Sequence, residues 1–157
     1  MPKKLKLIGR REYVDFPELD LHGLEAKIDT GAYTSALHCH DISVRKVDGV
    51  DTLCFFLLDP MHPEYNSQEQ RFTQFSKKMI KSSSGEAEER YIIKTLLKLG
   101  RKRIRTAISL TDRAGMRYPV LIGRKMIKNK FIIDVMQLHT GGLVLSKAFP
   151  YLSNTKK

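Results

Sequence analysis

The chain has 157 residues, 41% hydrophobic and 29% charged, which fits one soluble globular domain and excludes a disordered or fibrous protein. No apolar run approaches the ~20 residues of a membrane span, and no apolar segment follows the basic start, so we expect a cytoplasmic protein without membrane association. Cys39 and Cys54 are then expected to be reduced thiols. The formal net charge is +11, and Asp112 is the one acid between residues 90 and 130. This stretch favours an acidic partner: nucleic acid, ribosome or acidic peptide.

Short extended segments separated by turn residues make up most of the chain. Alternation of apolar and polar residues and β-rich composition mark the strands, whereas Pro60, Pro63 and their polar neighbours mark a loop over 59–70. The expected strands are 4–8, 13–16, 24–28, 35–44, 53–58, 72–80, 91–99, 104–110, 118–122, 131–135 and 143–145, with one short helix over 123–130. The pattern predicts an all-β closed barrel with one short helix, formed by a single domain over 1–152 and a frayed tail over 153–157.

The strand over 24–28 ends at an acid, and this is the point of greatest chemical interest. Leu24, Ala26 and Ile28 alternate with polar residues, and Asp29-Thr30-Gly31 then breaks the strand. Such a turn holds a carboxylate beside a hydroxyl and a glycine, where the backbone can approach a ligand closely. Since Asp, Thr and Gly also form ordinary turns, the triplet alone is a weak signal.

Motifs along the whole chain resemble retropepsin-like aspartic proteases. Ile28-Asp29-Thr30-Gly31-Ala32 resembles their active-site turn, and Val120-Leu121-Ile122-Gly123-Arg124 resembles their apolar strand ending in Gly-Arg before a short helix. Between them, Lys78-Met79-Ile80, the small residues 82–85 and the strand from Tyr91 resemble the flap hairpin. The resemblance implies the acid-protease barrel and an aspartic-type peptidase.

One bacterial branch is more similar still: the proteins named ATP-dependent zinc proteases, often associated with RimK-type ligases that add glutamates to a ribosomal protein. The residues that carry this are Gly9-Arg10-Arg11-Glu12, Ala26 to Ala32, Thr34 to His38, Ser82 to Gly85, Arg90 to Ile93 and Leu121 to Arg124. The resemblance implies a RimK-type ligase as associate and a glutamate-tailed ribosomal protein as substrate. Tyr33 departs from the pattern, because Arg is expected after the alanine.

The resemblance also assigns site residues. Asp29, Thr30 and Gly31 would form the catalytic turn, whereas Ala32, Tyr33, Ser82, Ser83, Ser84 and Gly85 would bind substrate. Gly123 and Arg124 would be structural, with Arg124 an ion-pair partner, because a permanently charged guanidinium is a poor proton shuttle. Asp134 is interpreted as a strand-end residue bonded to a turn.

Aspartic proteolysis needs two carboxylates around one water, and they share a proton because like charges that close cannot both stay ionised. The chain contains one Asp-Thr-Gly. The second Asp29 would therefore come from another copy, which predicts a homodimer with the site on its two-fold axis.

No cofactor is predicted from the residues. His38 and His40 share one side of a strand and are the first candidates for zinc, but neither Cys-x-x-Cys nor His-Glu-x-x-His is present. No Walker A loop is present either, so any ATP dependence would come from a partner. Two other hypotheses remain beside the peptidase: a non-catalytic binding module that docks acidic tails, RNA or the ribosome, and a zinc hydrolase.

Overall fold

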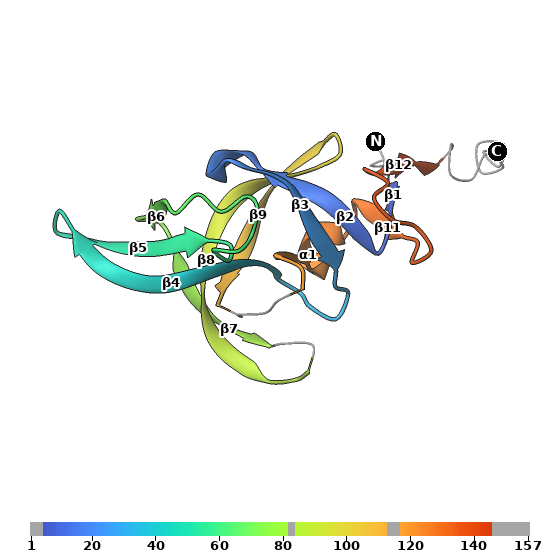
Figure 1. The fold of residues 1–157 in the computed structure, drawn as a ribbon. Helices are drawn as coiled ribbons and strands as arrows, with labels where there is room; N and C mark the ends of the chain where they lie inside the picture. The colour runs from blue at the N-terminus through green and yellow to red at the C-terminus, as the bar shows by residue number, and fades with distance from the viewer. Residues whose placement is uncertain (1–4, 82–83, 113–116, 146–157) are drawn as a thin grey trace.

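The computed structural model describes residues 5–81, 84–112 and 117–145, and these residues form a nearly all-β fold (Figure 1). Their one α-helix is α1 (Arg124–Ile127), and a 3-10 turn, η1 (Pro17–Leu19), precedes β3. The strands are β1 (Lys6–Ile8), β2 (Arg11–Phe16), β3 (Leu21–Ile28), β4 (Ser35–Val47), β5 (Val50–Leu57), β6 (Glu69–Phe72), β7 (Ser76–Lys81), β8 (Ala87–Leu99), β9 (Lys102–Thr111), β10 (Val120–Ile122), β11 (Phe131–Ile133) and β12 (Leu143–Val144).

The strand pairings run round a ring. The main sheet has the order β10-β3-β2-β8-β9-β4, and β10 also pairs with β4, so the sheet returns on itself. Beyond this ring, β5 and β6 extend β4 into an arm, and β7 and β8 form a hairpin that projects away from the body (Figure 1). A separate small sheet has the order β11-β1-β12. The predicted all-β class is confirmed.

Side chains that alternate along the strands fill the interior. In β2, for example, Glu12, Val14 and Phe16 are buried whereas Tyr13 is exposed, as expected of a strand with one face on a core. The largest fully buried side chains include Phe16, Phe55, Leu21, Leu24, Leu37, Leu97 and Leu99. Burying each such side chain contributes roughly 1.5–3 kcal/mol, which makes this core the main source of stability.

Two sequence-based boundaries are wrong. The strand expected over 72–80 is two strands, because β6 pairs with β5 whereas β7 pairs with β8, and the chain must leave one partner to join the other. The helix expected over 123–130 is reduced to α1, since Lys128 leaves the helical conformation and Asn129 has a left-handed φ of 65°. The expected tail over 153–157 lies outside the described residues. No helix in the described ranges is long and apolar enough to span a membrane.

A buried carboxylate fastens β2 to the loop that leads into β12. The Glu12 side chain is 0% exposed and accepts hydrogen bonds from the amides of Gly9 at 2.7 Å, Thr140 at 3.0 Å and Gly141 at 2.8 Å. The Thr140 hydroxyl donates a further bond at 2.8 Å. No ion pair to Glu12 is formed within the described residues. The three backbone N–H groups and the Thr140 hydroxyl therefore stabilise its carboxylate.

We predict that Glu12→Gln destabilises the fold by about 1–3 kcal/mol, because the amide group turns one acceptor into a donor that faces backbone N–H groups. Urea denaturation would measure this as a lower midpoint with an unchanged m-value. Glu64→Gln, on the exposed 59–68 loop, is the control and should leave the midpoint unchanged. Equal midpoints for the Glu12 variant and the control would contradict the prediction.

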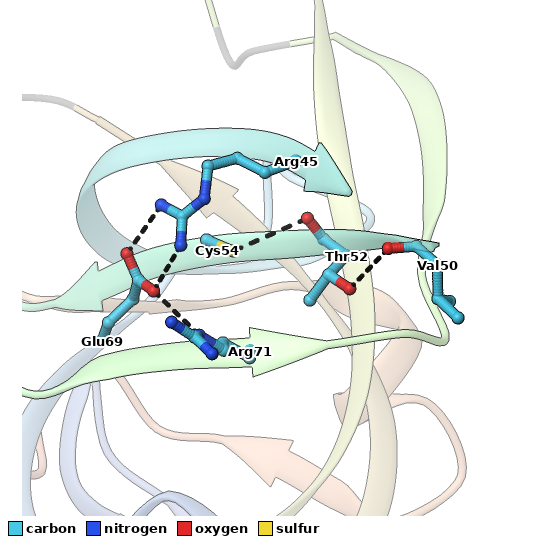
Figure 2. Close-up of polar contacts among 6 residues, drawn as sticks. All are labelled: Arg45, Val50, Thr52, Cys54, Glu69 and Arg71. Carbon is cyan, nitrogen blue, oxygen red and sulfur yellow. Dashed lines mark hydrogen bonds and ion pairs between the residues drawn. The ribbon is translucent and has the colours of Figure 1, made fainter. Parts of the chain in front are cut away.

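An ion cluster ties β4 to β6 across β5 (Figure 2). The Arg45 guanidinium donates to both oxygens of Glu69 at 2.9 and 2.8 Å, and Arg71 Nε donates to Glu69 Oε1 at 3.0 Å. These hydrogen bonds lower the pKa of Glu69 from 4.5 to about 2, and the one from Arg45 has the largest effect on that pKa. On the strand between them, Thr52 donates its hydroxyl to the Val50 carbonyl.

The lowered pKa of Glu69 predicts a pH-dependent contribution to stability. Its carboxylate stabilises the fold fully above about pH 4.5, and this contribution is lost as the pH falls toward 2, because the unfolded chain takes up the proton first. Glu69→Gln should therefore lose less stability than the native chain between about pH 6 and pH 3, measured by denaturation at low salt. A pH dependence equal to that of the native chain would refute this.

Candidate functional site

The Asp29 turn is held in place by its neighbour in the ring. β3 runs parallel to β10, with Ile28 opposite Ile122, and the amide of Asp29 continues this ladder by donating to the Ile122 carbonyl at 2.8 Å. The turn then closes on itself: the Gly31 amide donates to Asp29 Oδ1 at 3.1 Å and the Ala32 amide to the Asp29 carbonyl at 3.2 Å. The Asp29 carboxylate is thus fixed at a strand end, where the sequence predicts it, and the residue is partly buried.

The start of α1 locks the far side of the turn. The amide of Arg124 donates to the Ala32 carbonyl and that of Lys125 to the Tyr33 carbonyl, both at 2.9 Å. Gly123 makes this contact possible, because a Cβ there would lie 2.6 Å from the Tyr33 carbonyl oxygen. The amide of Gly123 also donates to Ser35 Oγ at 2.9 Å. Gly123 is therefore structural, by permitting a close backbone approach.

Arg124 holds the turn differently from the expectation. Its guanidinium donates to the Thr30 carbonyl at 2.8 Å and lies 5.7 Å from the centre of the Tyr33 ring. It forms no ion pair with a carboxylate in the described part of the chain, so the expected ion pair is replaced by a carbonyl contact and a cation–π contact. Tyr33, the departure from the expected arginine, is thus the platform beneath this cation.

A cleft of about 570 Å³ separates the turn from the β7–β8 hairpin. Residues from both sides line it: Gly31, Ala32, Tyr33, Thr34, Met79, Ile80, Lys81, Ser84, Gly85 and Arg124. The structure therefore brings Gly31 of the predicted catalytic turn, the predicted substrate-binding residues Ala32 and Tyr33, and the described part of the predicted hairpin tip to one cavity, whereas Asp29 and Thr30 do not line it. Ser82 and Ser83 lie outside the described residues. Asp29 contacts the lining of the cleft through the hydrogen bond that its Oδ1 accepts from the amide of Gly31.

Sequence reasoning missed several residues of the site. Met79, Ile80 and Lys81 line the cleft, although Met79 and Ile80 were predicted only as part of the hairpin and Lys81 was not named. Their position directly before the small-residue tip is the signal that could have identified them. Ser35 was also missed: besides the bond to Gly123, its carbonyl accepts from the Ser109 hydroxyl at 3.2 Å, which joins the turn to β9.

The charge of the cleft is positive. Lys81 and Arg124 are its two charged lining residues, and no acidic residue belongs to the wall in the described ranges. A cleft lined in this way attracts anionic groups and repels cations.

The histidines proposed for zinc do not form a donor set in the described residues. His40 Nδ1 lies 2.8 Å from the Leu58 carbonyl, and its ring stacks on Phe56 and Tyr65. His38 is buried on the same strand. No three His, Cys, Asp or Glu side chains of the described ranges come together to hold a metal ion. Burial raises the pKa of the free Cys39 thiol well above its usual range.

Asp134 lies away from the cleft. Its Oδ1 accepts from the Met136 amide at 2.9 Å, and its carbonyl accepts from the Gln137 amide at 3.0 Å. Asp134 therefore stabilises the turn that follows β11, in agreement with its interpretation as a strand-end residue bonded to a turn.

Comparison with known proteins gives relatives named as ligases. The chain is 36% identical over 132 residues to a protein of Shewanella pealeana and 34% identical over 134 residues to one of Desulfotalea psychrophila, each named "Probable alpha-L-glutamate ligase". The matches cover 82% of this chain but only 28% of each relative. The chain thus spans under a third of the length of these curated relatives.

The fold has a counterpart among solved structures. A crystal structure of the Legionella pneumophila protein Lpg0085, described as of unknown function, matches with a TM-score of 0.65 and 24% sequence identity. The match covers 87% of this chain and 98% of the other, and it shows likeness of fold. The family model described as retropepsin-like aspartic endopeptidase RimB matches residues 7–140. With the Asp29 turn, the Gly123-Arg124 lock and the cleft beneath the hairpin in place, the chain belongs to this RimB-like, retropepsin-like family.

Proposed function

We propose that this protein is an aspartic-type peptidase whose two catalytic carboxylates are the Asp29 side chains of a homodimer. The observation that carries the proposal is the Asp29 turn itself, which holds one carboxylate at a strand end beside a cleft of about 570 Å³. The retropepsin-like family match supports the same chemistry.

The turn is suitably placed for a second copy to reach it. Thr30 and Gly31 are exposed, so the tip of the turn lies on the protein surface. In the proposed dimer two such tips meet, and the Thr30 hydroxyls cross-link them. The paired Asp29 carboxylates then share one proton between them.

Each group of the proposed site has a separate task. The ionised Asp29 takes a proton from the water that attacks the peptide carbonyl, and the protonated Asp29 of the other copy donates to the carbonyl oxygen. When the tetrahedral intermediate collapses, a proton passes to the leaving amine. Ser84 and Gly85 on the β7–β8 hairpin close over the substrate and exclude water. Gly85 has a φ of 92°, which permits the tight reversal at this tip.

An acidic, glutamate-rich peptide is the substrate class that we propose. The positive wall of the cleft, Lys81 and Arg124, suits carboxylate side chains. The relatives named as alpha-L-glutamate ligases support a connection to glutamate chemistry. A glutamate-tailed ribosomal protein as substrate and a RimK-type ligase as associate are part of the proposal and come from the family resemblance.

A non-catalytic binding module with the same fold is the second candidate. The specific observation in its favour is that each chain provides one Asp-Thr-Gly, so a chain that stays monomeric lacks half of the dyad. Such a module would bind an acidic tail or RNA through the same positive surface without hydrolysis.

We predict that Asp29→Asn lowers kcat for a glutamate-rich peptide by roughly 10²–10⁴-fold, because the amide cannot accept the proton from water. The variant should unfold at the native midpoint. Asp48→Asn is the matched control: it makes the same change in charge at a β4–β5 turn where φ is 52°, a conformation that asparagine accepts. Cleavage by the Asp29 variant at the native rate would exclude the proposed chemistry.

Light scattering across a concentration series should give a mass that rises from 18.0 kDa toward twice that value. Addition of a glutamate-rich peptide should shift the rise to lower protein concentration, because substrate binds the paired cleft. A strict monomer at high concentration, with and without peptide, would favour the binding module.

A further inference from the structure

Two adjoining cavities outside the cleft are lined by lysines. One has a volume of about 590 Å³ and the other about 370 Å³, and both are bounded by Lys94, Ala107 and Lys125. Lys78 borders the first and Lys130 the second. We call the surface formed by Lys78, Lys94, Lys125 and Lys130 the lysine groove.

The lysine groove continues the cleft along two elements. On β7, Ser76 and Lys78 border the groove whereas Met79 to Lys81 border the cleft. On α1, Arg124 lines the cleft and the next residue, Lys125, lines the groove. Adjacent residues of β7 and of α1 therefore line the cleft and the groove.

The cations of the groove are available to a ligand. Within the described residues, Lys94, Lys125 and Lys130 form no ion pair, and no acidic residue lines either cavity. Arg105 also borders the smaller cavity, but it is engaged: it donates to Glu18 at 2.6 and 3.1 Å, and these bonds raise the pKa of Arg105.

We propose that the lysine groove is an exosite that binds the acidic part of the same extended peptide whose cleaved bond lies in the cleft. This inference rests on the proposed peptidase function. Lys94 and Lys125, which border both cavities, are its central contacts and contribute to specificity by binding carboxylates several residues away from the cleaved bond.

The surroundings favour a peptide over a nucleic acid. Phe72 and Phe75 border the larger cavity, but Phe72 stacks on Phe55 at 5.7 Å and Phe75 meets the edge of Tyr91 at 5.9 Å. These rings are engaged with other rings and do not form the open platform on which successive bases stack. They do provide an apolar floor for the stems of glutamate side chains.

Fluorescence anisotropy with a labelled glutamate-rich peptide tests the groove independently of cleavage. The variant Lys94→Glu/Lys125→Glu, made in an Asp29→Asn background, should raise Kd about tenfold or more, because two attractive charges become repulsive. Lys128→Glu in the same background is the control for charge reversal outside the groove: it lies at the end of α1, borders neither cavity and should raise Kd less than twofold. The neutral pair Lys94→Gln/Lys125→Gln provides a second variant in case the reversal disturbs folding.

Cleavage kinetics of variants that keep the native Asp29 distinguish the exosite proposal from the peptidase proposal. The groove variant should raise KM for the glutamate-rich peptide, leave kcat unchanged, and cleave a glutamine-substituted peptide as the native chain does. Equal Kd values for the groove variants and Lys128→Glu would overturn the exosite, even with cleavage intact. Binding of an RNA oligonucleotide of the same charge more tightly than the peptide would also overturn it. If neither the native chain nor the groove variants cleave the peptide, but peptide binding still depends on the lysine groove, the peptidase proposal is refuted and the groove remains a peptide-binding site.

Discussion

The three-residue strand β10 is the element on which the site depends. It pairs in parallel with β3 and antiparallel with β4, and so it holds side by side the two strands that begin and end at the Asp29 turn. Its last residue, Ile122, accepts the hydrogen bond from the amide of Asp29. Without β10, the turn would be a flexible loop between two strands that do not pair with each other, and the carboxylate would have no fixed direction.

The segment after β10 completes this arrangement through backbone contacts. Gly123, Arg124 and Lys125 all donate amide hydrogens toward the segment from Ala32 to Ser35. The contacts of Arg124 and Lys125 with backbone carbonyls depend on chain geometry more than on side-chain identity, whereas the contact of Gly123 needs the Ser35 hydroxyl and a residue without a Cβ. The side chain of Arg124, which also donates to the Thr30 carbonyl, and the side chain of Lys125 give the surface its positive charge on two sides of α1.

The sequence allowed prediction of features that depend on local patterns. Alternating residues placed most strands, and the strand-turn pattern at Asp29 located the acid correctly. Local patterns could not show that β10 lies between β3 and β4, because pairing partners more than eighty residues apart leave no periodic signal. The break between β6 and β7 was missed because it is a change of pairing partner: Phe72 pairs with Leu53 of β5, whereas Ser76 pairs with Ile92 of β8. The hydrogen-bond partners of a buried polar group are also not predictable from local sequence. The motif that contains Glu12 was visible, but its partners Thr140 and Gly141 reach it only through tertiary folding.

The pairing of the early and late parts of the chain has a consequence for synthesis on the ribosome. β1 is joined to β11 and β12, and Glu12 is buried only when the loop at Thr140 covers it. Contacts between such distant segments give a high contact order, which slows folding. During translation, β1 must therefore wait with an unpaired edge, and Glu12 stays solvated, until residues 131–144 have left the exit tunnel.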